Sequence, residues 1–163
     1  TEVNCGQVRG PVQLTFARSQ DPIFQQEVTI TRQAVANVKD IDKGQTMGKK
    51  QIVPYGLYRA EGYISAHLAK KTTGFSDSDL ELLWDSLINM FEHDHSASRG
   101  KLSAKKLIIF KHDSELGCCQ SHILFDKVKV ERLSKDSPPR SFNDYRVTVA
   151  KDVPKGVEII EKL

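Results

Sequence analysis

The chain has few of the residues that mark the commonest specialised protein classes. Its 163 residues include three cysteines, two methionines and one tryptophan. The cysteines are odd in number and two of them, Cys118 and Cys119, are adjacent, which favours a reduced intracellular protein over a disulfide scaffold. No apolar run approaches the roughly 18–20 residues that a membrane-spanning helix needs. We therefore expect a cytoplasmic protein with no membrane partner.

Motifs of common catalytic and metal sites are also lacking. The chain contains no G-x-x-x-x-G-K-[ST] phosphate loop and no G-x-S-x-G nucleophile elbow. His93 and His95 would point about 200° apart on a helix, so they do not face one metal ion. The Cys118-Cys119 pair has no obvious partner base. The sequence thus predicts no catalytic residue, no metal and no cofactor.

Charge is present but unevenly distributed. The net charge is only +3. Residues 75–96 contain six acidic residues and no lysine or arginine, whereas residues 99–135 contain nine basic residues against four acidic ones. Such asymmetry can orient a protein on a polyanion, and it is equally typical of an acidic helix followed by solvated strands.

The hydrophobic pattern predicts an α+β domain over residues 1–163, with at least one helix packed on an antiparallel sheet. The clearest helix runs from Asp77 to about Asp94, because six apolar residues recur on one face and Ser76 with Asp79 forms a capping-box pattern. Strands are predicted around residues 12–16, 27–32, 51–64, 105–112, 125–132, 145–149 and 156–163.

Residues 26–54 form the most informative segment. Two alternating stretches flank a polar region with turn formers at Asp40, Asp42, Gly44 and Gly48, which predicts an extended hairpin projecting from a sheet. Pro54 cannot donate to a sheet ladder, so this part lies at an edge. A basic tip with one apolar residue suits single-stranded nucleic acid, and lysines on a hairpin also serve solubility alone.

Basic residues recur beside small residues near the predicted strand ends. Small neighbours allow a phosphodiester chain to approach the backbone, and lysine or arginine neutralises it. The tyrosines at 55, 58 and 63 could stack on bases, although each one singly is more typical of an ordinary sheet core. The candidate RNA-binding residues are Arg9, Arg18, Arg32, Met47, Lys49, Lys50, Arg99, Lys105 and Lys106.

Several segments together resemble one known family. They are VRGPVQLTFARS, ITRQAV, TMGKKQIVPYGLY, GFSDSDLELLWDSLINMFEHD and SASRGKLSAKKLIIFKH. In this order they resemble the Cas seven family, the repeated backbone subunit of the type I-C CRISPR Cascade complex. The resemblance implies a modified RRM-like (ferredoxin-like) antiparallel sheet with a packed helix. Residues 26–54 would then be the inserted thumb hairpin.

The resemblance also implies a function. The subunit would be a non-catalytic part of an RNA-guided antiviral surveillance complex, binding CRISPR guide RNA and stacking as a filament. Its partners would be the guide RNA, target DNA through the guide, copies of itself and other Cascade subunits. Met47 would sit at a displaced base, with Lys49, Lys50, Arg9 and Arg18 on phosphates. Since family members are longer, we expect this chain to be the C-terminal part of such a subunit.

Two other functions fit the residues less closely. One is an RNA-processing endoribonuclease on a ferredoxin-like fold, with His93 or His112 as general base. The other is a protein–protein module whose basic arm docks an acidic partner.

Overall fold

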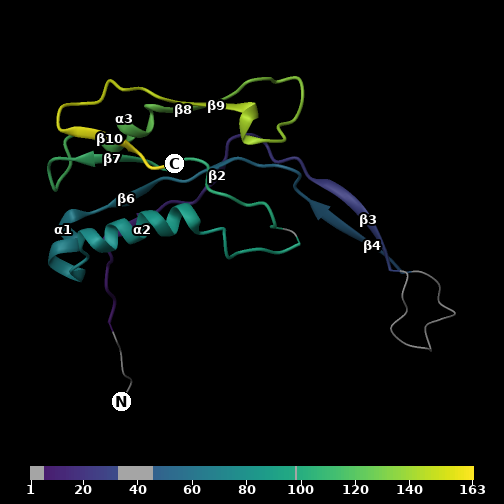
Figure 1. Ribbon diagram of the computed structural model, residues 1–163, viewed down its shortest axis with the longest axis horizontal. Helices are drawn as coiled ribbons and strands as arrows, with labels where there is room; N and C mark the ends of the chain where they lie inside the picture. Colours follow the sequence, from purple (N-terminus) through teal and green to yellow (C-terminus); the bar gives the residue numbers. More distant parts are fainter. Residues whose placement is uncertain (1–5, 33–45, 98) are drawn as a thin grey trace, which may run out of the picture.

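A computed structural model describes residues 6–32, 46–97 and 99–163. The described strands pair antiparallel in five two-stranded ladders (Figure 1). This mixture of helices and antiparallel strands confirms the α+β class. Because these strands pair only in twos, the RRM-like arrangement stays a prediction. The strands are β1 (Val12–Leu14), β2 (Arg18–Ser19), β3 (Gln26–Arg32), β4 (Thr46–Ile52), β5 (Tyr58–Arg59), β6 (Gly62–Ile64), β7 (Ile108–His112), β8 (Val128–Arg132), β9 (Tyr145–Val149) and β10 (Val157–Glu161).

Three of the ladders follow one another along a single long ribbon. β1 pairs with β6, β2 with β5 and β3 with β4, so the first strand of the ribbon runs outward and the second returns beside it. Backbone hydrogen bonds extend the pairing between ladders, from Thr15 N to Glu61 O and from Gln20 N to Leu57 O, both at 2.8 Å. The ribbon therefore carries the chain continuously from the body of the molecule to the projecting hairpin.

Two one-residue insertions interrupt the register of this ribbon. The chain advances three positions from Thr15 to Arg18 but only two from Glu61 to Arg59. It then advances seven positions from Ser19 to Gln26 but six from Tyr58 to Ile52. Extra residues of this kind bend a strand and increase its twist. They explain why the predicted strand over 51–64 is broken into the end of β4, β5 and β6, with Pro54 in the first gap.

The β3–β4 hairpin projects away from the rest of the molecule (Figure 1). Its register runs from Gln26 opposite Ile52 to Arg32 opposite Thr46. Gly48 was expected to form a turn, but it lies within β4 opposite Ile30. The other turn formers of this segment, at 40, 42 and 44, lie outside the described residues.

The helical segments follow the ribbon. α1 (Ala66–Leu68) continues into a π-helical turn, η2 (Ala69–Thr73), and α2 (Asp77–Asn89) comes next. The predicted capping box is confirmed, because Ser76 N donates to Asp79 Oδ2 at 2.8 Å and Asp79 N donates to Ser76 Oγ. The hydrogen bonds that the backbone N–H and the hydroxyl of Ser76 donate to Asp79 Oδ2 lower the pKa of this carboxyl. The helix ends at Asn89, earlier than predicted. A turn follows there, closed by a hydrogen bond from Glu92 N to Asn89 O.

The remaining strands form two ladders: β8 pairs with the next strand β9, and β7 pairs with the last strand β10. The helix α3 (Ser121–Phe125) lies between β7 and β8, and the 3-10 turn η3 (Phe142–Asp144) lies between β8 and β9. The prediction of a strand beginning at Phe125 was wrong by three residues, because this residue ends α3 and β8 begins at Val128. The β-prone residues of α3 become helical there because Leu124 is buried, which illustrates how packing overrides propensity.

The ribbon packs on α3 and β8 through alternate residues of its returning strand. Tyr63 meets the ring of Phe125 edge to face at 5.6 Å. Arg59 donates to the carbonyls of Phe125 and Val128 at 2.8 and 2.9 Å, and pairs with Glu61 at 2.9 Å. Residues two apart on a strand share a face, so this face of the ribbon is turned inward.

Tyr145 ties both legs of the hairpin to the body. Its hydroxyl donates to Asp21 Oδ2 at 2.5 Å, just before the outgoing leg, and its ring stacks on Tyr55 of the returning leg at 6.3 Å. Arg132 lies 3.5 Å from the other carboxylate oxygen of Asp21. Among the described hydrophobic residues, only Ala69, Leu124 and Tyr145 are buried. The hairpin root is therefore one of the few well-buried points of the chain.

Replacing this hydroxyl tests the anchor. Burial, followed by the hydrogen bond to Asp21, raises the pKa of Tyr145 above its ordinary value of 10.0. Because the pKa is higher in the folded state, the tyrosine ionises first in the unfolded chain as the pH rises. The contribution of Tyr145 to the free energy of unfolding is therefore complete below pH 10 and declines above pH 10. Tyr145→Phe should lower the free energy of unfolding by about 1.5–3 kcal/mol and flatten its fall above pH 10.

Urea denaturation at pH 8 and at about pH 10.5 measures both effects. Tyr58→Phe is the matched control, since Tyr58 is exposed. Equal pH dependence in the two variants would contradict the anchoring role of Tyr145.

Candidate nucleic-acid interface

One face of the β3–β4 hairpin is polar and carries an exposed methionine. Met47, Lys49 and Gln51 alternate along β4 and share a face with their partners on β3. The Met47 side chain is 72% exposed. Glu27 holds the polar groups in place, because its carboxylate pairs with Lys49 at 2.8 Å and accepts from Gln51 Nε2 at 2.9 Å. The charge of Lys49 is thus already balanced within the hairpin.

The opposite face carries apolar residues together with Lys50. Lys50 lies directly opposite Val28 and shares this face with Ile30 and Ile52. Val28 and Ile30 are both exposed, and Lys50 has no ion pair among the described residues. The two adjacent lysines, predicted to act together on phosphates, therefore point to opposite faces and cannot grip one phosphate group side by side.

Arg18 lies beside a second arginine that the sequence did not single out. It pairs directly with Arg59 across β2 and β5, and directly opposed residues share a face of a sheet. The guanidinium of Arg59 pairs with Glu61 and donates to two carbonyls, whereas exposed Arg18 has no polar partner among the described residues. An anion outside the chain would complete this pair. Only the cross-strand register, invisible in the sequence, reveals it.

The other predicted basic residues are spread over the molecule. Arg9 lines an open cavity of about 450 Å³ together with Pro11 and Tyr63. Arg99 pairs with Asp94 at 2.9 Å, and Lys106 pairs with Glu161 at 3.2 Å, while Lys105 is exposed. The Arg32 side chain lies outside the described residues. The structure therefore leaves Arg9, Arg18, Lys50 and Lys105 as the predicted cations without an internal partner among the described residues.

A projecting hairpin with a basic, methionine-bearing strand coincides with a family match over most of the chain. The model for CRISPR-associated protein Cas7 matches residues 1–150. The chain belongs to the Cas7 family. The match includes the hairpin and every described element through β9, and it stops before β10. No curated protein matches the chain significantly.

The tyrosines of this Cas7 chain divide into two groups. Tyr55 stacks on Tyr145 and serves the protein interior, whereas Tyr63 contacts Phe125 and is still 45% exposed. Burial, followed by the charge of Asp144, raises the pKa of Tyr55. Tyr58 is exposed, and its ring lies 3.0 Å from the position that a side chain on Gly56 would take. Of the three, Tyr58 and Tyr63 have accessible rings.

One candidate general base of the nuclease alternative, His112, is engaged within the chain. His112 Nδ1 accepts the backbone N–H of Cys118 at 2.9 Å, which puts the ring proton on Nε2 and gives the ring a structural role. Cys118 Sγ in turn donates to Gly156 O at 3.1 Å. Within the described ranges, no three histidine, cysteine or acidic side chains gather where a metal ion could bind. In the same ranges no helix has the length and apolar character needed to cross a membrane.

The different environments of the two lysines predict different salt dependence. For single strands, each phosphate contact contributes about −0.7 to the slope of log K against log salt concentration. Lys50→Gln should make the slope for single-stranded RNA shallower by about this amount, because Lys50 has no internal anion. Lys49→Gln should leave it nearly unchanged, and Glu27→Gln should make it steeper by releasing Lys49.

Fluorescence anisotropy over a series of salt concentrations measures the three slopes. Identical slopes for Lys49→Gln and Lys50→Gln would contradict the separation of the two lysines.

Proposed function

We propose that this Cas7-family chain is a non-catalytic backbone subunit of a type I-C CRISPR surveillance complex. It binds guide RNA, meets target DNA through the guide, and assembles as a filament with copies of itself and with other Cascade subunits. The family match supports a CRISPR-associated RNA-binding backbone role. The observation that carries the finer proposal is the hairpin that leaves the body of the molecule with exposed faces on both sides.

The geometry of the hairpin supports its role as a thumb over residues 26–54. The β3–β4 ladder projects from the body (Figure 1), so exposed Met47 and Lys50, which has no ion pair among the described residues, can reach a neighbouring molecule. A flexible, apolar methionine fits between loosely stacked bases, and flanking cations neutralise the backbone. The RRM-like body would then hold guide RNA, with Arg9, Arg18 and Lys105 as cations that lack internal partners among the described residues.

Charge reversal on the hairpin tests RNA binding. Lys49→Glu with Lys50→Glu should weaken guide-RNA binding at least tenfold in the full-length subunit, because the cation of Lys50 is lost and two new carboxylates on the hairpin repel the phosphates. The matched control is Lys151→Glu with Lys155→Glu, two exposed lysines on the β9–β10 connection without ion pairs among the described residues. Unchanged affinity in the hairpin variant, measured by gel shift, would contradict an RNA-binding hairpin.

Replacing the exposed methionine tests the wedge. In the assembled complex, Met47→Ala should disturb the regular spacing of displaced guide bases without abolishing binding, because it removes the apolar side chain and leaves the cations. Chemical probing of guide nucleotides along the filament measures this spacing. Met90→Ala, at an exposed methionine beside the end of α2, is the control. Normal guide segmentation in the Met47 variant would show that the wedge lies elsewhere.

A further inference from the structure

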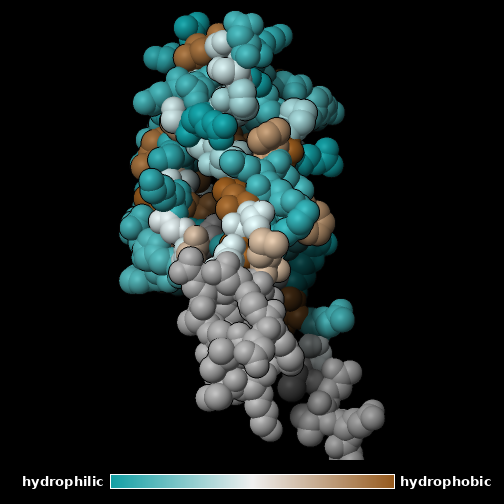
Figure 2. Space-filling model, turned by 90° about the vertical axis from the view of Figure 1, so that its right-hand side faces the viewer, coloured by the Kyte–Doolittle hydropathy of each residue, from teal (hydrophilic) through white to brown (hydrophobic). Residues whose placement is uncertain are grey.

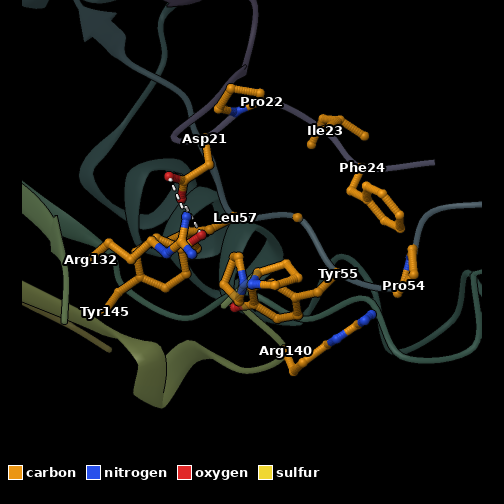
Figure 3. A pocket seen from close by; sticks show the side chains of 13 residues that line it. Asp21, Pro22, Ile23, Phe24, Pro54, Tyr55, Leu57, Arg132, Arg140 and Tyr145 are labelled. Atoms are coloured by element: carbon orange, nitrogen blue, oxygen red, sulfur yellow. Dashed lines mark hydrogen bonds and ion pairs between the residues drawn. The ribbon is translucent and has the colours of Figure 1, made fainter. Parts of the chain in front are cut away.

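A cavity of about 210 Å³ opens at the root of the hairpin (Figure 3). Its walls come from three parts of the chain: residues 21–24 before β3, residues 54–57 after β4, and the β8–β9 ladder with the loop that joins its strands. None of the nine residues predicted to bind RNA lines it. The cavity lies below the roughly 300–1,000 Å³ of pockets for drug-sized ligands, so its size suits one ring system.

One part of this cavity is built from rings. Phe24 and Tyr55 contribute aromatic faces, and Pro22, Pro54, Pro138 and Pro139 contribute rigid apolar walls. The Phe24 side chain is 58% exposed, and in Figure 3 it lies with Pro54 at the end away from Asp21. Figure 2 views the molecule from the side that carries the hairpin and shows apolar side chains among hydrophilic ones there. Proline walls lose little freedom on binding, which favours a preformed site for a flat ring.

The other part is polar and has an unsatisfied donor. Arg132 and Asp21 pair at 3.5 Å, and Tyr145 donates to the same carboxylate. The guanidinium of Arg132 also donates to Ser137 O, but its buried Nε–H has no acceptor among the described residues. An unpaired buried donor costs about 1–3 kcal/mol. Because this Nε is not accessible even to a water molecule, an occupant of the cavity cannot reach it either, and the polar part of the cavity is a fixed wall held by the Asp21 and Ser137 contacts.

A cation stands at the mouth of the cavity. Arg140 lines it, is exposed and extends toward Pro54 (Figure 3). Its backbone is held in place, because the N–H groups of Arg140 and Ser141 donate to Asp144 Oδ2 at 2.7 and 2.9 Å. These two bonds lower the pKa of Asp144. The guanidinium of Arg140 is thus available for an anion attached to whatever fills the cavity.

We propose that this cavity binds one unpaired base of single-stranded RNA, with the adjoining phosphate on Arg140. The base stacks against the Phe24 side of the cavity. A nucleotide supplies both groups that the accessible walls can bind: a flat ring for Phe24 and the prolines, and an anion for Arg140. This site rests on the proposed RNA-binding function and extends it from the hairpin faces to the hairpin root.

The site is tested with the full chain and a single-stranded RNA carrying one 2-aminopurine. Stacking should quench the 2-aminopurine fluorescence on binding. Phe24→Ala should abolish most of the quenching and raise Kd by about five- to one-hundredfold, whereas Phe24→Trp should keep both near the original values. Phe16→Ala is the matched control, because Phe16 is 96% exposed on the same ribbon and does not line the cavity.

The phosphate contact has its own readout. Arg140→Gln should reduce the salt slope of binding by about 0.7 in magnitude, and Arg146→Gln, at an exposed arginine of β9, should not change it.

The outcomes separate this site from the proposed function. If the original chain binds the RNA but Phe24→Ala behaves like Phe16→Ala, the base site is wrong and the RNA-binding role stands. If the original chain binds no RNA, both are wrong. If Phe24→Ala weakens only self-association, the cavity accepts a side chain of a second copy and the base site is wrong.

Discussion

The arrangement of this chain depends on the contacts that Tyr145 makes at the root of the hairpin. Its hydroxyl donates to Asp21, which precedes β3, and its ring stacks on Tyr55, which follows β4. One buried side chain therefore fixes both strands of the hairpin at its root. A two-stranded ribbon is only marginally stable in water by itself. The hairpin can therefore project with exposed faces because its root is packed against the β8–β9 ladder.

The same root explains how structure and function are connected. Both insertions in the ribbon lie on its outgoing strand, and the second lies between Ser19 and Gln26, in the segment that lines the cavity. Such insertions re-aim a strand and leave residues outside the ladder. Here they free Asp21 and Phe24 from strand pairing, one to anchor the hairpin and the other to line a cavity. A base held at this point would lie beside the element that we propose to act as a thumb.

Local features of the fold were predictable because they depend on neighbouring residues. The alternation at 27–32 and 145–149 predicted strands, Ser76 with Asp79 predicted the helix start, and each is present. Features that depend on distant residues were not predictable in the same way. α3 forms where a buried Leu124 overrides the local preference, and the strand over 51–64 is broken by insertions that only the partner strand defines. Family membership followed from several segments matching together, which no single motif would have established.

The sequence alone determined the chemistry of the candidate site: a basic hairpin with one methionine, and arginines near strand ends. Tertiary structure decided which of these groups are available. Glu27 neutralises Lys49, and Lys50 lies on the other face of the hairpin. Strand pairing sets Arg18 opposite Arg59. The cavity is formed by segments more than a hundred residues apart, such as those of Asp21 and Tyr145. The reason is physical. The type of each side chain follows directly from the sequence. Strand register and packing determine which residue balances a charge or completes a cavity.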